Sequence, residues 1–282
     1  NRQEIDEKSY YRSISYEQYL TLRHANENNI EDFVWEFKNI ITHSKDAHKI
    51  IKNGFKDPSQ EIKSAIIRCN SVSQKTLLAL IDDEDVSIRQ YVAKSYNITE
   101  RELQLLSTDE DVEVRDAVAN NRNTPADVLK VLSTDKALKV KKSVAFNRNT
   151  PVDALKILSK DKDAEIRKDV VNNRNTSTDV LRVLSTDDNL EVRKAVAYNE
   201  NTPIDALKIL SRENNSVILC NIARNLNASA DILRTLSREN NSVLLSNIAF
   251  NKNTPADVLL KLAHIRNSEI RSTVALNVNT TP

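Results

Sequence analysis

The sequence predicts an all-α solenoid made of short two-helix repeats, and two observations support this fold class. A segment typified by Thr202–Ser211 recurs with a period of about 26 residues, and a leucine near its end keeps that spacing along the chain. These leucines are Leu106, Leu132, Leu158, Leu184, Leu210, Leu236 and Leu262. In addition, the 282 residues include one glycine, whereas sheets and tight hairpins depend on glycine for unusual backbone angles. A period of this length indicates stacked units, each too small to bury its own apolar face.

Each repeat is expected to contain two helices. The first has a start signal, as in residues 124–127, where Thr124 would be the N-cap and Pro125 the first helical residue. A turn containing Asp109 or its equivalents is expected to cap the second helix, in which Val114 and Val118 face the core. Helices of about 10 residues do not persist alone, so stacking must stabilise them.

The first part of the chain does not follow the period. We predict an N-terminal helical capping region over residues 1–54 and an array of about eight to nine helical repeats over residues 55–282, with Gly54 and Pro58 at the junction. In residues 30–41, apolar side chains recur at spacings of three and four, which indicates one buried helix face. A cap would cover the first repeat, as solubility requires; the alternative is an independent binding module.

The repeat pattern Val-Arg-x-Ala-Val-Ala-x-Asn-x-Asn-Thr-Pro-x-Asp-x-Leu-x-x-Leu, as in Val192–Leu210, resembles the bacterial leucine-rich repeat variant, a HEAT-like family. The resemblance covers about residues 80–282. It implies a right-handed superhelix of alternating short helices. The family repeat is slightly shorter than the period seen here, and its founding member carries an N-terminal iron–sulfur cluster for which this chain lacks the cysteines. We therefore carry over the fold and not the cluster.

Composition argues against several function classes. Lys plus Arg number 41 and Asp plus Glu number 40, so no global field attracts nucleic acid or an anionic membrane. No apolar run approaches the ~20 residues of a membrane span, and Cys69 and Cys220 are too far apart in sequence for a metal or disulfide framework. The sequence shows no catalytic motif. We therefore predict a cytoplasmic, non-enzymatic protein without a cofactor or metal.

Two sets of polar residues recur with the period and are interpreted as structural ladders. A basic column next to the core and an acidic column are expected to join neighbouring repeats through ion pairs. The basic column comprises Arg89, Arg115, Arg167, Arg193 and Arg271, with Lys63 and Lys141. Asparagines such as Asn121 and Asn123 end the second helix, because asparagine tolerates the left-handed conformation and its amide satisfies loose backbone groups. We expect these side chains to bridge loops.

A binding surface is predicted from two irregularities. The last position of the second helix is aromatic in every second repeat, and such rings on a concave surface would anchor a partner; alternatively, each packs into the next repeat's loop. Two repeats replace the usual Glu-Val-Arg by apolar triplets, which either repack the core or form a contact surface. The predicted partner-binding residues are Phe146, Tyr198, Val217, Leu219, Val243, Leu245 and Phe250.

Basic residues in the middle of the array are the candidate anion or phosphate site. They lie in the loop after the second helix and on the outer side of that helix. These residues are Arg122, Lys142, Arg148, Lys168, Arg174 and Lys194.

The resulting hypothesis is a scaffold for protein–protein recognition through a concave face. The alternative is a solenoid that binds the nucleic-acid (DNA) backbone, and a third hypothesis is a HEAT-like DNA glycosylase. A further hypothesis is self-association through an open C-terminal repeat that leaves Val274 and Leu276 uncovered. The salt dependence of binding distinguishes the protein-binding from the nucleic-acid-binding hypothesis, because phosphate binding weakens steeply as the salt concentration rises.

Overall fold

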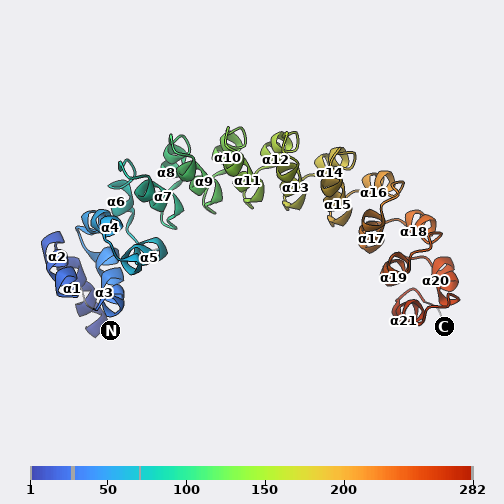
Figure 1. The fold of residues 1–282 in the computed structure, drawn as a ribbon, viewed down its shortest axis with the longest axis horizontal. Coiled ribbons are helices and arrows are strands. Elements are labelled where there is room, and N and C mark those ends of the chain that lie inside the picture. The colour runs from blue at the N-terminus through green and yellow to red at the C-terminus, as the bar shows by residue number, and fades with distance from the viewer. Residues whose placement is uncertain (1, 27–28, 70, 281–282) are drawn as a thin grey trace. The chain divides into compact units, whose positions relative to one another are not determined.

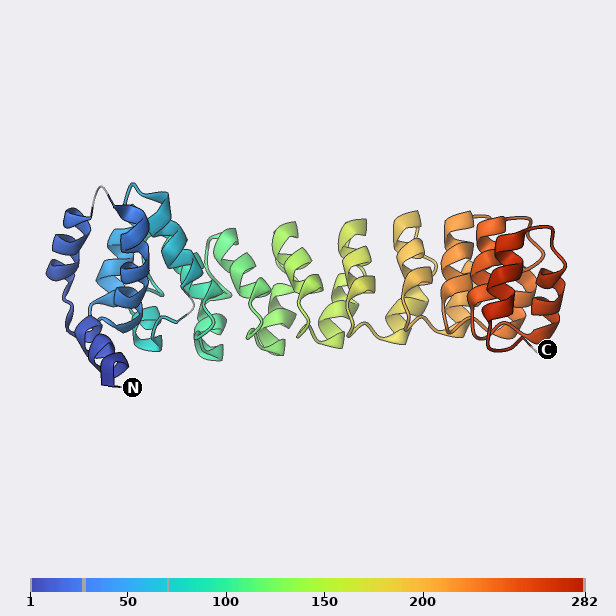
Figure 2. The same cartoon turned by 90° about the horizontal axis from the view of Figure 1, so that it is seen from below.

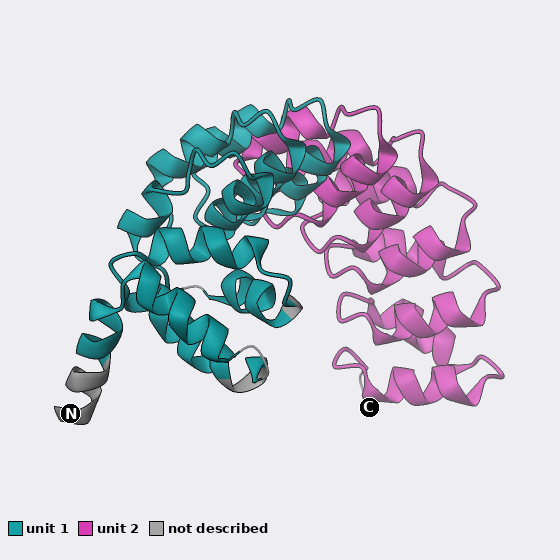
Figure 3. Ribbon diagram, turned by 60° about the vertical axis from the view of Figure 1, so that its left-hand side comes forward, with its two compact units in different colours: residues 1–149 teal, residues 150–282 magenta. Residues whose placement is uncertain are grey.

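The computed structural model describes residues 2–26, 29–69 and 71–280, and over these residues the chain is helical and contains no strand (Figure 1). The chain forms two compact units, residues 1–149 (unit 1) and residues 150–282 (unit 2), which Figure 3 colours separately. Helices alternate along each unit and pack on their sequence neighbours. The predicted fold class, an all-α solenoid of short two-helix repeats, is confirmed.

Unit 1 begins with helices that precede the regular repeats. Its helices are α1 (Arg2–Ser13), α2 (Tyr16–Ala25), α3 (Ile30–His43), α4 (Ala47–Lys56), α5 (Gln60–Arg68), α6 (Gln74–Leu78), α7 (Val86–Lys94), α8 (Glu100–Leu106), α9 (Val112–Asn120), α10 (Ala126–Leu132) and α11 (Leu138–Phe146).

Unit 2 is regular throughout. Its helices are α12 (Val152–Leu158), α13 (Ala164–Asn172), α14 (Thr178–Leu184), α15 (Leu190–Tyr198), α16 (Ile204–Leu210), α17 (Ser216–Arg224), α18 (Ala230–Leu236), α19 (Ser242–Phe250), α20 (Ala256–Ala263) and α21 (Ser268–Leu276).

The second helices of the repeats form the inner row of unit 2. From α13 to α21 each odd-numbered helix packs along the next odd-numbered one, whereas the even-numbered first helices contact one another much less. Figure 1 shows the odd-numbered helices on the inner side of this unit and the even-numbered ones outside, and Figure 2 shows its successive repeats side by side. Side chains such as Val192, Val196 and Leu207 are fully buried between the two rows. The apolar period of the sequence is therefore the core of the stack.

Helices α1 to α4 occupy most of the region that we predict to be a cap. An aromatic cluster of Tyr19, Phe33 and Phe37 forms its interior, and each of these rings is at most 1% exposed. Gly54 lies inside α4 and not in a linker. A Cβ there would lie 2.6 Å from Ile66 Cδ1 of α5, so this glycine permits the close approach of two helices. The functional division at residue 54 stays a prediction.

The first helix of the regular repeats starts one residue later than the sequence suggests. Pro125 is the N-cap in an extended conformation, and the helix begins at Ala126. The Thr124 hydroxyl is buried and donates to the carbonyl of Val118 at 2.6 Å, so it does not cap the helix. This carbonyl lies at the end of the preceding helix, where the backbone N–H of Asn121 also donates to it, at 3.0 Å. In the repeats where serine replaces proline, Ser177 and Ser229 are the N-caps and accept from the Val180 and Ile232 N–H groups.

The second helix is also capped by a different residue than expected. Asp111, and not Asp109, is the N-cap and accepts from the Glu113 N–H at 2.7 Å. Asp109 accepts from the Asp111 N–H at 2.9 Å and receives two hydrogen bonds from Arg89 of the preceding repeat, at 2.8 and 3.0 Å. An aspartate with a guanidinium partner makes stronger bonds there than at a cap.

The predicted ion-pair ladder is confirmed within each unit. Arg115 forms a bidentate pair with Asp135 at 2.7 and 3.2 Å and also donates to the carbonyl of Asp109 at 2.8 Å. Each arginine thus links its own turn to the turn of the next repeat. The equivalent pairs are Arg89–Asp109 in unit 1 and Arg167–Asp187 and Arg193–Glu213 in unit 2.

The asparagines form a second ladder at the other end of the second helices. Asn251 donates through Nδ2 to the carbonyls of Ala223 and Asn225 in the preceding repeat at 2.8 and 3.0 Å, and its Oδ1 accepts from the Asn253 N–H. The predicted bridging of loops is confirmed. The predicted left-handed conformation of these asparagines is wrong, because no non-glycine residue in the described part of the chain has a positive φ. Asn251 itself is extended, with φ −67° and ψ 126°.

We predict that Asn251→Ala lowers the free energy of unfolding by about 1–3 kcal/mol, because the buried carbonyl of Ala223 loses its donor. Urea unfolding followed by circular dichroism measures this loss. The control is Asn172→Ala, since Asn172 is exposed at the end of α13 and should change stability by less than about 0.5 kcal/mol. Equal effects of the two changes would contradict the role of the ladder.

The ion-pair ladder predicts a loss of stability in acid. Burial opposes ionisation of Asp135, but hydrogen bonds from Arg115 and from the Ala137 N–H outweigh it and hold the pKa of the carboxyl below its usual value. The pair therefore stabilises the fold fully above the unfolded pKa of ~3.9, and this stabilisation disappears as pH falls through the lower folded pKa.

We expect the urea concentration at the midpoint of unfolding to decrease when the pH is lowered from about 5 to about 2.5. The decrease should be smaller in Asp135→Asn, which has no carboxylate to protonate at this position. Asp127→Asn is the control, because Asp127 is exposed and lies outside the ladder. An Asp135→Asn protein with the full acid sensitivity of the wild type would show that the pair contributes nothing.

Candidate binding surface

From α7 to α21, the last residue of each second helix points away from the core, and we call these residues the helix-end column. In unit 1 the column comprises Lys94, Asn120 and Phe146; in unit 2 it comprises Asn172, Tyr198, Arg224, Phe250 and Leu276. The exposed fractions of Phe146, Tyr198 and Phe250 are 79%, 69% and 75%. The rings therefore do not pack into the next repeat's loop, which was the alternative interpretation.

A second exposed column lies two residues further along, in the loop between the paired asparagines or, for Tyr96, between Ser95 and Asn97, and we call it the loop column. In unit 1 it comprises Tyr96, Arg122 and Arg148; in unit 2 it comprises Arg174, Glu200, Leu226, Lys252 and Val278. Within each unit, asparagines of the next repeat donate to the carbonyls of loop-column residues. Asn149, for example, donates to the carbonyl of Arg122 at 2.5 Å. The two columns thus stand on a fixed backbone.

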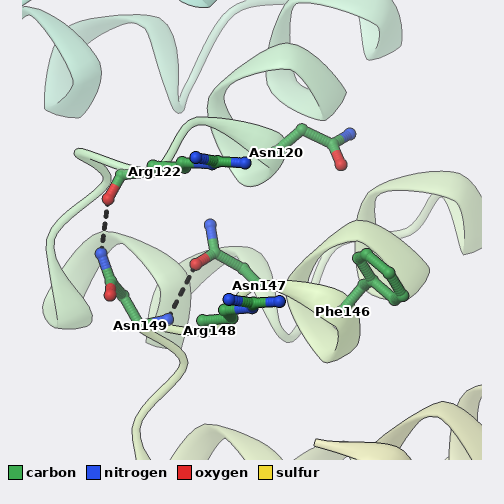
Figure 4. Close-up of a pocket in the computed structure, with 6 residues that line it drawn as sticks. All are labelled: Asn120, Arg122, Phe146, Asn147, Arg148 and Asn149. Atoms are coloured by element: carbon green, nitrogen blue, oxygen red, sulfur yellow. Dashed lines mark hydrogen bonds between the residues drawn. The ribbon is translucent and has the colours of Figure 1, made fainter.

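In unit 1 the two columns enclose a depression of about 390 Å³ (Figure 4). Its lining residues are Asn120, Arg122, Phe146, Asn147, Arg148 and Asn149. The side chains of Arg122 and Arg148 extend in the same direction, and that of Arg148 points toward Phe146 (Figure 4). A guanidinium beside an exposed ring suits a ligand that carries both a carboxylate or phosphate and an apolar group.

A neighbouring depression of about 290 Å³ continues this surface toward the N-terminus. Lys94 and Tyr96 line it together with Asn120 and Arg122, and Tyr96 is 72% exposed. Neither Tyr96 nor Lys94 is among the binding residues predicted from the sequence. Tyr96 stands one full period before Arg122, so the repeat itself could have identified it as a member of the same column.

The structure changes the interpretation of the predicted basic residues. Lys168 bonds Glu165 at 3.0 Å and Lys194 bonds Glu191 at 2.7 Å, and each of these glutamates lies on the same helix as its lysine. The hydrogen bond that Lys168 donates to the Glu165 carboxylate raises the pKa of Lys168. Arg122 and Arg148 line the same depression in unit 1, Lys142 is half-buried on α11, and Arg174 is exposed in unit 2. Anion binding by these residues stays a prediction.

Half of the predicted apolar contact surface is buried. Val217 and Val243 are 47% and 62% exposed, but Leu219 and Leu245 are only 8% and 6% exposed and belong to the core. The two leucines occupy positions equivalent to Arg193, and a side chain at this position lies between adjacent repeats. Their inclusion among the contact residues was therefore wrong.

At the end of the array Val274 is 3% exposed and Leu276 is 83% exposed. Leu276 is uncovered as the self-association hypothesis assumed, whereas Val274 is not. The association itself stays a prediction.

Neither a metal centre nor a membrane span is found among the described residues. No group of histidine, cysteine, aspartate or glutamate side chains within them has a geometry that could hold a metal ion. The helices there are all too short or too polar to cross a bilayer.

Comparison with known proteins supports the fold. No family model and no curated protein matches the sequence. A solved structure described as a leucine-rich repeat variant with a novel repetitive structural motif is 24% identical, with a TM-score of 0.55, and the match covers 76% of this chain and 84% of that one.

Two further structures are more distant. The Escherichia coli protein YibA is 16% identical with a TM-score of 0.42, covering 78% of this chain and 97% of its own. A designed armadillo repeat protein in complex with the peptide (KR)4 is 16% identical with a TM-score of 0.18, covering 81% and 96%. These two TM-scores are too low to support a conclusion. The resemblance seen in the repeat pattern is confirmed by the first match, and the chain has the fold of a leucine-rich repeat variant.

Proposed function

We propose that the chain is a non-enzymatic scaffold that recognises a protein partner through the helix-end and loop columns. The observation that carries this proposal is the exposure of Phe146, Tyr198 and Phe250 at one position of the repeat. Large aromatic side chains on rigid elements are typical anchors of protein interfaces, because they bury much area and lose little conformational entropy on binding.

The size of each anchor suggests that binding involves several repeats. Full burial of one phenylalanine contributes about 1.5–3 kcal/mol, whereas micromolar affinity requires about 8 kcal/mol in total. A single ring cannot reach that value after the cost of association. An elongated partner that contacts the columns in successive repeats of a unit therefore suits this surface better than a small partner.

The alternative partner is a nucleic-acid backbone. Arg122 and Arg148 line one depression with Phe146, and a phosphate beside a base would satisfy both kinds of side chain. The ion pairs of Lys168 and Lys194 with their own helices argue against an extended phosphate track in unit 2. The protein scaffold is therefore the preferred function.

We predict that a triple variant, Phe146→Ser, Tyr198→Ser and Phe250→Ser, loses its protein partners while it keeps its fold. Quantitative mass spectrometry of affinity-purified wild type and variant measures the loss. The matched control replaces Val131, Val183 and Leu260 by serine, since these residues are 60%, 63% and 65% exposed on first helices. Each exposed change should alter the free energy of unfolding by less than about 0.5 kcal/mol.

The same purification at low and high salt separates the two functions. Partners held by aromatic anchors should remain at high salt, whereas nucleic acid held by arginines should be released as salt rises. Loss of the same proteins from the test and control variants would exclude the helix-end column as the binding surface. Recovery of nucleic acid alone would favour the alternative.

A further inference from the structure

Unit 1 contains a pocket of about 320 Å³ between α5 and α7 that lies outside all of the sites described so far except for Lys94. Phe55 and Tyr91 form its aromatic part, Ile67 lines one side, and Lys63 and Lys94 supply cations. Ser87 and Gln90 complete the lining.

Two aromatic residues account for the opening between these helices. Phe55 stands where regular repeats carry a serine, as at Ser107, and Tyr91 stands where they carry a small residue, as at Ala117. The two rings meet edge to face, with centroids 5.8 Å apart and planes at 64°. Over the described residues, α5 packs on α3 and α7 packs on α9 much more closely than α5 and α7 pack on each other. The ring pair thus holds the two helices apart.

The separation leaves a large apolar side chain in solvent. The position of Ile67 is filled in the next repeats by Ala93 and Ala119, which are fully buried between adjacent second helices. Ile67 is instead 58% exposed. The Tyr91 hydroxyl donates to the carbonyl of Cys69, so the phenol group is satisfied and does not itself require a ligand. The pocket can therefore bury an apolar group against Phe55 and Ile67.

The charges around the pocket favour an acidic ligand. Lys63 occupies the ladder position of Arg89, and its equivalent ladder partner would be Asp83. Asp83 pairs instead with Lys52 of α4, with 2.6 Å between Lys52 Nζ and Asp83 Oδ2. Among the described residues neither Lys63 nor Lys94 forms an ion pair. Both ammonium groups are thus available to a carboxylate.

We propose that this pocket binds a bulky apolar side chain carried by an acidic polypeptide segment. The apolar side chain contacts Phe55 and Ile67, and flanking carboxylates pair with Lys63 and Lys94. Ser87 is placed to bond the backbone of the segment, whereas Gln90 Nε2 donates to Glu113 Oε2 at 3.5 Å. The inference rests on the proposed protein-binding function for taking the ligand to be a polypeptide, but apart from Lys94 it uses residues outside the two columns.

The experiment uses three capped pentapeptides as probes: Glu-Glu-Phe-Glu-Glu, the same peptide with alanine at its centre, and Lys-Lys-Phe-Lys-Lys. Titrations of the full chain are followed by NMR of isoleucine methyl groups, with the Ile67 signal assigned from Ile67→Val. We expect the Ile67 signal to shift and saturate with the first peptide. The alanine peptide should bind at least ~10-fold more weakly because it lacks the buried phenylalanine. The lysine peptide should also bind at least ~10-fold more weakly because it cannot form the two ion pairs.

Two substitutions test the pocket itself. Binding to the variants is measured by fluorescence anisotropy of the labelled first peptide, because Ile67→Glu removes the isoleucine signal. Ile67→Glu and Lys94→Glu should each weaken binding of this peptide at least ~5-fold, because each adds a negative charge where the acidic segment lies. Leu105→Glu is the matched control, since Leu105 on α8 is also 58% exposed and lies outside the pocket.

The proposal is overturned if the Ile67 signal does not move, if the three peptides bind equally, or if Leu105→Glu weakens binding as much as Ile67→Glu. The proposed function is tested on Phe146, Tyr198 and Phe250, none of which lines this pocket. A negative peptide titration therefore does not bear on the triple-variant purification, and a negative purification does not affect the Ile67 signal.

Discussion

The hydrogen bonds of the asparagine ladder are the interaction on which the repeat geometry depends. A helix of nine residues leaves its last carbonyls without intrahelical donors, and this chain has almost no glycine to close helix ends with a left-handed residue. The chain instead leaves each second helix in an extended conformation, and the asparagine of the next repeat donates to those carbonyls. A repeat is thus completed only by its neighbour, which makes stability a nearest-neighbour property.

This constraint also fixes where a binding surface can form. The asparagine holds the residue after the helix, so the residue before it must point away from the core, as Phe146 and Phe250 do. At the other end of the second helix the arginine ladder fixes the turn. The positions between the ladders that face the core are apolar throughout, whereas the helix-end and loop columns vary freely between aromatic, basic, acidic and aliphatic residues. Variation there costs the fold little, so these columns can adapt to a ligand.

The sequence was informative wherever a residue type recurred with the period. The two-helix repeat and both ladders followed from it. Local geometry was harder to predict from the sequence. Thr124 could cap a helix or donate to the Val118 carbonyl, and the choice depends on which buried carbonyl the packing places nearby. The burial of Leu219 and Leu245 had the same origin. The pocket near Ile67 was not found at all, because the early repeats deviate from the pattern and each deviation looks like simple divergence until Phe55 and Tyr91 are seen in contact.

The charges of the chain show why composition alone does not predict a ligand. Most arginines of the ladder and several lysines, such as Lys168 and Lys194, are paired with acids of the protein, so they create little field for a partner. The near-zero net charge therefore does not describe every surface. In unit 1 the ladder is interrupted at Lys63, because Lys52 takes its acidic partner, and the helix-end column there begins with another lysine. Electrostatic selectivity in such a stack therefore arises where a ladder is interrupted, as at Lys63, or on exposed columns outside the ladders, as at Arg122.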